Sequence, residues 1–184
     1  MDSKVIKVKG ERLKVKGALS VLCILCSVLF FSCKQNDWID WKMQNELWLE
    51  HNKTLDSVEV SSTGLQYKII ADPMDSCGEA MPNTTSIIYC DYTLRLINDH
   101  VIDQGSYVKI PLSSTVPGFA EGCHKIHNQG DIELYVPAYL GYDFQQYSNG
   151  SYYDAEGSGT EGTTGYIPPY STLIFTVHIC AISD

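Results

Sequence analysis

From about residue 65 onward, short segments that are apolar, or in which apolar and polar residues alternate, are separated by polar breaks that contain Gly, Pro, Asn or Asp. Runs of this kind, bounded by turn residues, are typical of β-strands. We expect strands over residues 65–70, 87–97, 100–103, 107–112, 131–136 and 171–180. Pro117-Gly118 opens a stretch that predicts a short helix over residues 119–127. The pattern therefore predicts an α+β domain in which one short helix packs on one face of an antiparallel sheet.

One segment of this body is too polar to bury. Residues 143–166 are rich in Gly, Ser, Thr and Tyr, and their carboxylates are too sparse for a calcium-binding loop. We expect a long, mobile surface loop here, before the last strand.

A second helix is predicted ahead of the body, over residues 38–52. Trp38, Trp41, Trp48 and Leu49 recur at spacings that form an apolar stripe on a helix. Docking of this stripe on the following domain is the favoured interpretation, and contact with a partner or a membrane is the alternative.

The first 32 residues have the pattern of an export signal. Six basic residues precede residue 17, and residues 18–32 carry no charge. That apolar core is shorter than the roughly 20 residues that a membrane-spanning helix needs. With Ser32 before Cys33, the segment resembles a bacterial lipoprotein signal, which implies cleavage before Cys33 and acylation of that cysteine. An uncleaved anchor and a non-lipidated signal are the alternatives.

Charge separates this head from the body. The whole chain of 184 residues has 13 basic and 22 acidic side chains, a formal net charge of -9. Removing residues 1–32 takes away six basic residues, Asp2 and Glu11, and leaves 7 − 20 = -13. An acidic body argues against nucleic acid as a partner. A hydrophobic content of 44% is enough for a buried core.

The cysteines and histidines do not predict a redox or metal centre. Four of the seven cysteines, Cys77, Cys90, Cys123 and Cys180, belong to the body, and none forms a C-x-x-C pair there. Three complete pairings are open to them in an exported protein, although Cys90 and Cys180 also suit buried, unpaired positions. His124 and His127 beside Cys123 suggest a plain helix face rather than a metal site. We expect no metal and no cofactor.

Five short motifs then occur in a characteristic order. They are Ser62-Thr63-Gly64-Leu65-Gln66-Tyr67, the pair Tyr92 and Asp103, Pro117-Gly118-Phe119-Ala120-Glu121-Gly122, Val136-Pro137-Ala138-Tyr139-Leu140-Gly141-Tyr142, and Ile167-Pro168-Pro169-Tyr170 with the strand that follows. In this order the chain resembles the FKBP-type peptidyl-prolyl isomerases over about residues 63–183. The resemblance implies a twisted antiparallel sheet curled around one short helix. It divides the chain into a signal peptide (1–32), a tether and Trp-rich helical extension (33–62) and an FKBP-like domain (63–184).

The resemblance also implies a pocket for a prolyl ring. Tyr92 and Phe175 would form its walls, and Phe119 its floor, where the family more often has tryptophan. Asp103 would lie near the twisting amide, and Tyr142 would donate its hydroxyl to a substrate carbonyl.

Further positions follow from the same resemblance. Val116 would present its backbone to the peptide, and Ile167 would line the rim. Ile102 and Val108 occupy positions that are usually aromatic, so the site would be wider and would lack ring stacking against proline. Asp143 stands where the family commonly has a glycine.

The implied function is rotation about X-Pro bonds in proline-containing polypeptides, without nucleophile, metal or cofactor. With the signal, it predicts an isomerase that assists the folding of exported proteins and is held in the bacterial cell envelope, at a membrane, through acylated Cys33. Two alternatives stay open. One is a catalytically weak FKBP-like module that binds peptides, and the other is a structural surface lipoprotein assembled through its Trp-rich segment.

Overall fold

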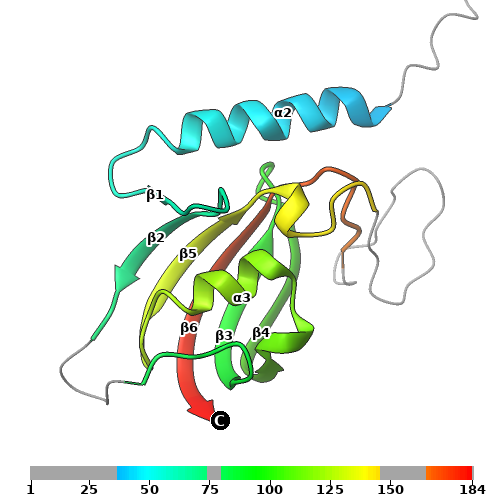
Figure 1. Cartoon of the computed structure of the whole chain (residues 1–184). Coiled ribbons are helices and arrows are strands. Elements are labelled where there is room, and N and C mark those ends of the chain that lie inside the picture. The colour runs from blue at the N-terminus through cyan, green and yellow to red at the C-terminus, as the bar shows by residue number, and fades with distance from the viewer. Residues whose placement is uncertain (1–36, 74–79, 146–164, 184) are drawn as a thin grey trace, which may run out of the picture. The chain divides into compact units, whose positions relative to one another are not determined.

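The computed structural model describes residues 37–73, 80–145 and 165–183. Trp38–Asp184 form one compact unit, which Figure 1 shows with its sheet, a short helix on one face and a longer helix across one end. The signal segment, Cys33 and most of the expected loop 143–166 lie outside the described residues. Within those residues, no helix has both the length and the apolar character needed to cross a membrane.

The sheet has six strands in the part of the chain that the structure describes. In chain order they are β1 (Glu59–Val60), β2 (Gln66–Ala71), β3 (Ile87–Arg95), β4 (Val101–Pro111), β5 (Asp131–Val136) and β6 (Leu173–Ser183). Their order in the sheet is β1-β2-β5-β6-β3-β4, and every neighbouring pair is antiparallel. The final strand therefore lies at the centre, between β5 and β3, as Figure 1 shows.

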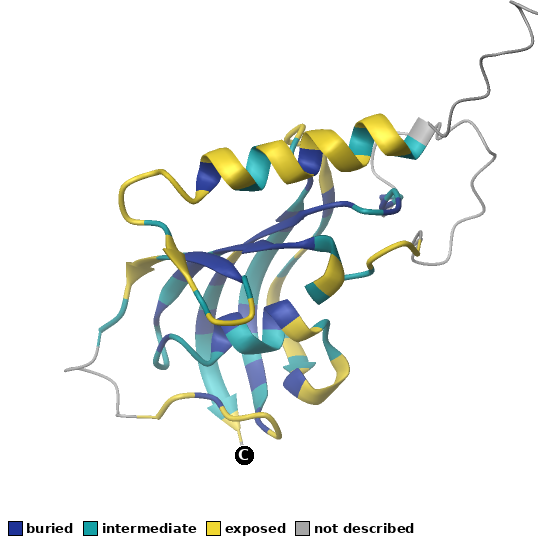
Figure 2. Cartoon of the chain, turned by 45° about the horizontal axis from the view of Figure 1, so that its top comes forward, coloured by how far each residue is buried: buried dark blue, intermediate teal, exposed yellow. Residues whose placement is uncertain are grey.

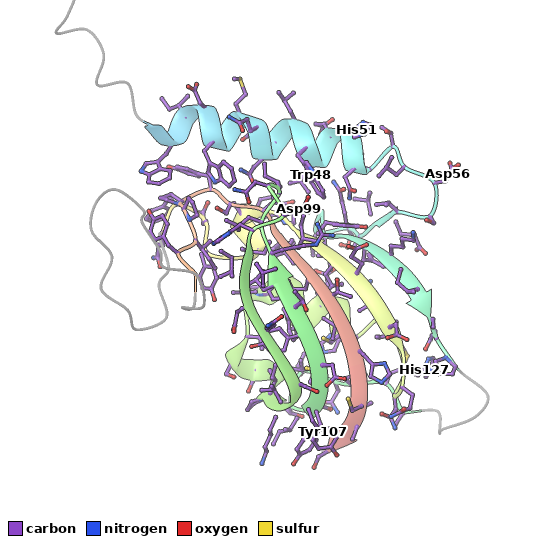
Figure 3. All side chains as sticks on the ribbon, turned by 180° about the vertical axis from the view of Figure 1, so that it is seen from behind. Trp48, His51, Asp56, Asp99, Tyr107 and His127 are labelled. Carbon is purple, nitrogen blue, oxygen red and sulfur yellow. The ribbon has the colours of Figure 1, made fainter. Side chains whose placement is uncertain are left out.

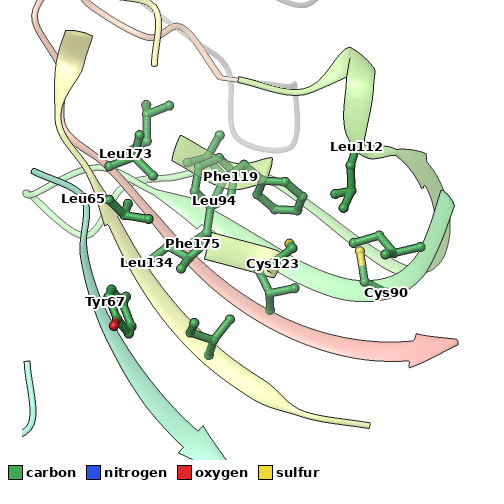
Figure 4. Close-up of a cluster of buried hydrophobic side chains, with 14 of the residues drawn as sticks. Leu65, Tyr67, Cys90, Leu94, Leu112, Phe119, Cys123, Leu134, Leu173 and Phe175 are labelled. Carbon is green, nitrogen blue, oxygen red and sulfur yellow. The ribbon is translucent and has the colours of Figure 1, made fainter. Parts of the chain in front are cut away.

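The short helix α3 (Pro117–Cys123) covers the concave face of the sheet. Pro at the first helical position suits a helix start, because its missing N–H has no partner there in any helix. Gly122 lets α3 approach β5, since a Cβ there would lie 2.3 Å from a methyl group of Leu134. Figure 4 shows Phe119 and Cys123 of α3 in the core beside Leu94 and Phe175 of the sheet. The expected sheet curled around one helix is thus confirmed.

The N-terminal helix α2 (Asp37–Asn52) docks on the domain, as its tryptophans predict. The ring of Trp38 lies 6.2 Å from that of Tyr166, and the ring of Trp48 lies 5.7 Å from that of Tyr135. Figure 3 shows Trp48 on the side of α2 that faces the sheet. The tryptophans therefore contact the protein's own domain, which removes the observation behind a Trp-mediated assembly.

The outward side of α2 carries a second apolar set that the sequence analysis did not single out. Ile39, Met43 and Leu47 follow one another at four-residue spacing, and each is more than half exposed. Figure 2 shows the exposed positions along this helix.

Several predicted boundaries were wrong, and three of the differences have a clear structural reason. Residues 101–111 form one strand instead of two pieces, because shifts of register against β3 absorb the polar break around Gly105. The helix expected to reach His127 ends at Cys123, and the N–H of His127 instead bonds to the Asp72 carboxylate at 2.9 Å. Strand β6 begins at Leu173, because Ser171 and Thr172 bond to α2.

The described cysteines are free thiols. Cys90 and Cys123 are buried and Cys180 is half-buried, while Cys77 lies outside the described residues. Burial raises the pKa of the Cys90 thiol to about 12 and also raises that of Cys123. Thiolate chemistry at these two positions is therefore suppressed at neutral pH.

Candidate active site

A hollow of about 530 Å³ opens on the concave face, between α3 and the sheet. Its lining combines aromatic rings, aliphatic side chains and a few polar groups. The lining residues are Tyr92, Leu94, Asp103, Ile110, Ser114, Thr115, Val116, Pro117, Phe119, Tyr142 and Phe175. Of the nine sequence-predicted pocket residues, it brings together six: Tyr92, Asp103, Val116, Phe119, Tyr142 and Phe175.

The floor and one wall are a pair of phenylalanine rings. Phe119 of α3 and Phe175 of β6 have ring centroids 5.0 Å apart and planes inclined at 66°, an edge-to-face arrangement. Phe119 is only 3% exposed, so core packing fixes its orientation. Figure 4 shows the two rings beside Leu94. An apolar ring entering the hollow would meet a rigid aromatic surface.

The polar side of the hollow is organised around Asp103. The Tyr92 hydroxyl donates to Asp103 Oδ2 at 2.8 Å, and the Gln104 N–H donates to Oδ1 at 2.9 Å. Burial, and then this carboxylate, raise the pKa of Tyr92, so the phenol stays protonated and keeps donating at neutral pH. Among the lining residues, Asp103 is the one with an acidic or basic side chain of the Asp, Glu, Lys or Arg type.

Val116 lies at the N-terminal end of α3. Its carbonyl oxygen accepts the N–H groups of Phe119 at 3.0 Å and Ala120 at 3.2 Å. The first helical turn therefore uses this oxygen. The backbone group with which Val116 can hydrogen-bond to a bound chain is its N–H.

Tyr142 reaches the hollow from a tight loop after the 3-10 helix η2 (Ala138–Leu140). The N–H of Gly141 and that of Asp143 both donate to the Ala138 carbonyl, at 2.8 Å each. Asp143 has a φ of +53°, a left-handed conformation in which glycine is favoured and aspartate is tolerated. This geometry explains why a glycine at this position suits the loop.

Three predicted pocket residues are not among those that line the hollow. Ile102 and Ile167 are buried in the core, and Ile102 accepts the Gly165 N–H at 2.8 Å through its carbonyl. Val108 is half-buried and lies beside Gly105, where an added Cβ would meet Val108 at 2.4 Å and the Tyr92 ring at 3.1 Å. Direct substrate contact by these three residues stays a prediction.

The structure adds lining residues that sequence reasoning missed. Leu94 and Ile110 complete the aliphatic walls, and Ser114 and Thr115 lie at the rim with η1 (Leu112–Ser114). Leu94 and Ile110 look like ordinary inward-facing strand residues, so only their places opposite α3 distinguish them. Among the described residues, no group of three or more His, Cys, Asp or Glu side chains is arranged to hold a metal ion.

This fold and this hollow are those of an FKBP-type domain, and the comparisons with known proteins agree. The family model of FKBP-type peptidyl-prolyl cis-trans isomerases matches residues 78–180. The chain belongs to this family.

Relatives and solved structures carry the likeness over most of the chain. The chain is 32% identical over 146 residues to the "Probable FKBP-type peptidyl-prolyl cis-trans isomerase FkpA" of Neisseria meningitidis, covering 77% of this chain and 46% of that one. It is 28% identical over 145 residues to the "Outer membrane protein MIP" of Legionella longbeachae, covering 77% and 54%. The chain thus spans about half the length of these curated relatives.

The crystal structure of FkpA from Escherichia coli matches the fold with a TM-score of 0.64 at 24% identity, over 97% of this chain and 76% of that chain. A peptidyl-prolyl cis-trans isomerase structure from Pseudomonas syringae matches with a TM-score of 0.63 at 17% identity, over 82% and 99%.

Proposed function

We propose that this protein catalyses the cis–trans isomerisation of X-Pro peptide bonds. The observation that carries the proposal is the convergence of Tyr92, Asp103, Phe119, Tyr142 and Phe175 on one hollow. These residues come from β3, β4, α3, the loop after η2 and β6, so the whole fold is needed to assemble them. Family membership supports the same activity.

The reaction makes and breaks no covalent bond, so its barrier is that of rotation. Twisting the amide costs about 18–20 kcal/mol because it destroys resonance, and the uncatalysed exchange takes tens to hundreds of seconds. Only interactions that are stronger in the twisted state than in the planar states accelerate the step. Each gain of about 1.4 kcal/mol is a tenfold gain in rate.

The apolar surface of the hollow favours the twisted state over the planar states in one way. Phe119 would lie under the prolyl ring, with Phe175 and Tyr92 beside it, and the ring would displace water from the hollow. The planar amide is more dipolar than the twisted one, so it loses more hydration free energy when water leaves the hollow. Desolvation therefore lowers the free-energy barrier between the planar and twisted states.

The polar groups of the hollow supply a second interaction that is stronger in the twisted state. We assign to the Tyr142 hydroxyl and the Val116 N–H the hydrogen bonds to substrate carbonyls. Asp103, fixed by Tyr92 and Gln104, would stabilise the twisted amide electrostatically. Because these groups are held before substrate arrives, little reorganisation is needed during the rotation.

A proline-peptide assay tests the proposal. A soluble chain that begins at residue 34 includes the whole compact unit Trp38–Asp184. We expect it to accelerate isomerisation, and Tyr142→Phe to lower kcat/KM by about threefold to tenfold through loss of one hydrogen bond. A folded parent chain with no rate above background would reject catalysis.

A second candidate function is peptide binding with little turnover. It is favoured by Ile102 and Val108, aliphatic residues at positions that are usually aromatic in the family. It predicts that peptide binds while the rate stays near background, and that Val108→Phe raises the rate. Ile102→Phe is the harder test, because Ile102 is buried and a ring there overpacks the core.

We further propose that the protein works in the cell envelope on exported, proline-containing polypeptides, held at a membrane by acylated Cys33. The apolar run before Cys33 supports this, and one relative is named an outer membrane protein. Labelling cells with a fatty-acid analogue should mark the full chain but not its Cys33→Ala variant. Labelling of both, or of neither, would contradict acylation at this residue.

A further inference from the structure

Helix α2 is fastened to the domain at two separate places by buried asparagines. Midway along the helix, Asn45 accepts the N–H of Thr172 through Oδ1 at 2.7 Å and donates to the Trp41 carbonyl at 2.8 Å. Near its end, Asn52 donates to the Gln66 side chain at 2.9 Å, and Gln66 donates to the Leu49 carbonyl at 3.0 Å. Asn45 is 2% exposed and Asn52 is 3% exposed, so both are desolvated to the same degree.

The two attachments lead to different parts of the domain. Asn52 and Gln66 connect α2 with β2, on the far side of β5 from β6. Asn45 connects α2 with Thr172, three residues before the cavity wall Phe175, and Trp41 Nε1–H donates to the neighbouring Ser171 Oγ at 3.0 Å. Ser171 and Thr172 are themselves buried.

From this segment, hydrogen bonds continue to the loop that carries Tyr142. The Ser171 hydroxyl donates to the Pro168 carbonyl at 2.7 Å. The Tyr170 N–H donates to the Asp143 carbonyl at 2.6 Å, and the Asp143 N–H donates to the Ala138 carbonyl at 2.8 Å. Asp143 directly follows Tyr142, so the backbone next to the site tyrosine is held from the segment that α2 anchors.

The backbone here needs such support. Tyr170 has a φ of +62° and Asp143 a φ of +53°, and neither is a glycine. Such conformations persist only when surrounding contacts impose them. Helix α2 lies directly against this region, since a cleft of about 250 Å³ is lined by Lys42 and Asn45 of α2 together with Tyr139, Asp143 and Tyr170. The Lys42 ammonium also lies 5.1 Å from the centre of the Tyr170 ring.

We propose that Asn45 and Trp41 are positioning residues for the isomerase site, which place the Tyr142 loop through the 170–172 segment. The inference rests on the proposed function and extends it to a helix that has no residue in the hollow. Helix α2 then sets the catalytic rate of the domain behind it, and the attachment through Asn52 does not.

The matched variants Asn45→Ala and Asn52→Ala test this in the chain that begins at residue 34. Each removes one buried asparagine that joins α2 to the domain, so both should lower the unfolding midpoint in urea. We expect Asn45→Ala to lower kcat/KM by about fivefold, and Asn52→Ala to leave it within about twofold. Trp41→Phe, which removes only the N–H, should act in the same direction as Asn45→Ala and less strongly.

Coupling to Tyr142 separates positioning from general loosening. In a Tyr142→Phe background, Asn45→Ala should cost less than about twofold, because the hydroxyl it positions is already gone. Amide hydrogen exchange should quicken at Tyr170 and Asp143 in Asn45→Ala and stay unchanged there in Asn52→Ala.

The outcomes distinguish the two proposals. A catalytic parent in which both asparagine variants lose the same activity, or in which Asn45→Ala costs as much without the Tyr142 hydroxyl, overturns the positioning role alone. Unchanged exchange at Tyr170 in Asn45→Ala overturns it as well. A folded parent without catalysis overturns the proposed function, and the positioning role falls with it.

Discussion

Two hollows of about 530 Å³ each lie on opposite faces of the same sheet. The concave one is the candidate active site. The outer one is lined mainly by polar side chains of β3, β4, β5 and β6, among them Asp91, Gln104, Asp131, Thr176 and His178. At about equal volume, the concave hollow therefore has the more apolar lining, although Tyr92 lines both, and the difference follows from strand alternation.

Strand β6 shows the alternation directly. Phe175, Val177 and Ile179 are buried, whereas Thr176 is exposed and His178 is half-buried. Successive residues point to opposite faces of a sheet, so one strand supplies an apolar wall to one hollow and polar groups to the other.

Several polar groups of the outer hollow already have hydrogen-bond partners within the protein. His178 lies opposite Asp91 on β3 and Asp131 on β5, and its Nδ1 is 2.9 Å from Asp131 Oδ1. Asp91 accepts the Ser106 hydroxyl at 2.8 Å and the Tyr107 N–H at 2.7 Å. The concave hollow instead has aromatic surface that a ligand can cover, which gains about 25 cal/mol for each Å² removed from water. Apolar surface beside one fixed carboxylate, and not volume, distinguishes the site.

The largest expected effect comes from a matched pair of aspartates. Asp103 and Asp91 each accept one hydroxyl and one backbone N–H, but on opposite faces. We expect Asp103→Ala to lower kcat/KM about tenfold or more in the proline-peptide assay, and Asp91→Ala to leave it within about twofold. Equal losses in the two variants would remove the distinction between the faces.

A smaller effect is expected from the floor of the site. Phe119→Leu removes the edge-to-face pair with Phe175 and should cost about 1–2 kcal/mol of stability and several-fold in rate. Ile179→Val, in the core of the same strand as Phe175, should cost about 1 kcal/mol without changing the rate. Urea unfolding and the peptide assay measure the two quantities, and a rate loss in both variants would show that general stability controls activity.

The smallest effect is a pH dependence of the outer face. The Tyr107 N–H and the Ser106 hydroxyl hold the pKa of Asp91 below its ordinary value of 3.8. A carboxyl with a lowered folded-state pKa stabilises the protein above its unfolded pKa, and this contribution is lost as the pH falls through the folded value. The difference in unfolding free energy between the parent and Asp91→Ala should be constant near neutral pH and shrink below about pH 4. A difference that grows on acidification would contradict this sign.

Local pattern was enough for the elements whose partners are near in sequence or whose alternation is regular. Strand β5 occupies the predicted residues 131–136, and helix α2 begins one residue from its predicted start. The errors have long-range causes. The N–H of His127 bonds to Asp72, 55 positions away, so the predicted helix ends early. The N–H of Thr172 bonds to α2, 127 positions away, so the predicted strand begins late.

The site divides in the same way. Tyr92, Asp103, Phe119, Tyr142 and Phe175 could be placed because their motifs occur in the family's order, and the geometry brings them together. Leu94 and Ile110 could not, because an aliphatic residue on a strand carries no sign of whether a helix covers it or a cavity opens above it. The role of Asn45 was also invisible, since a polar residue on a helix stripe has no partner until the fold supplies one.

The central claim is that the concave hollow, and not its equal on the outer face, binds the prolyl ring. Titrating the isotope-labelled chain with a short proline-containing peptide and following its NMR spectrum tests this most directly. We predict shifts at Tyr92, Asp103, Phe119, Tyr142 and Phe175, and none at Asp131 or His178. Shifts centred on Asp131 and His178, with the aromatic residues unmoved, would contradict it.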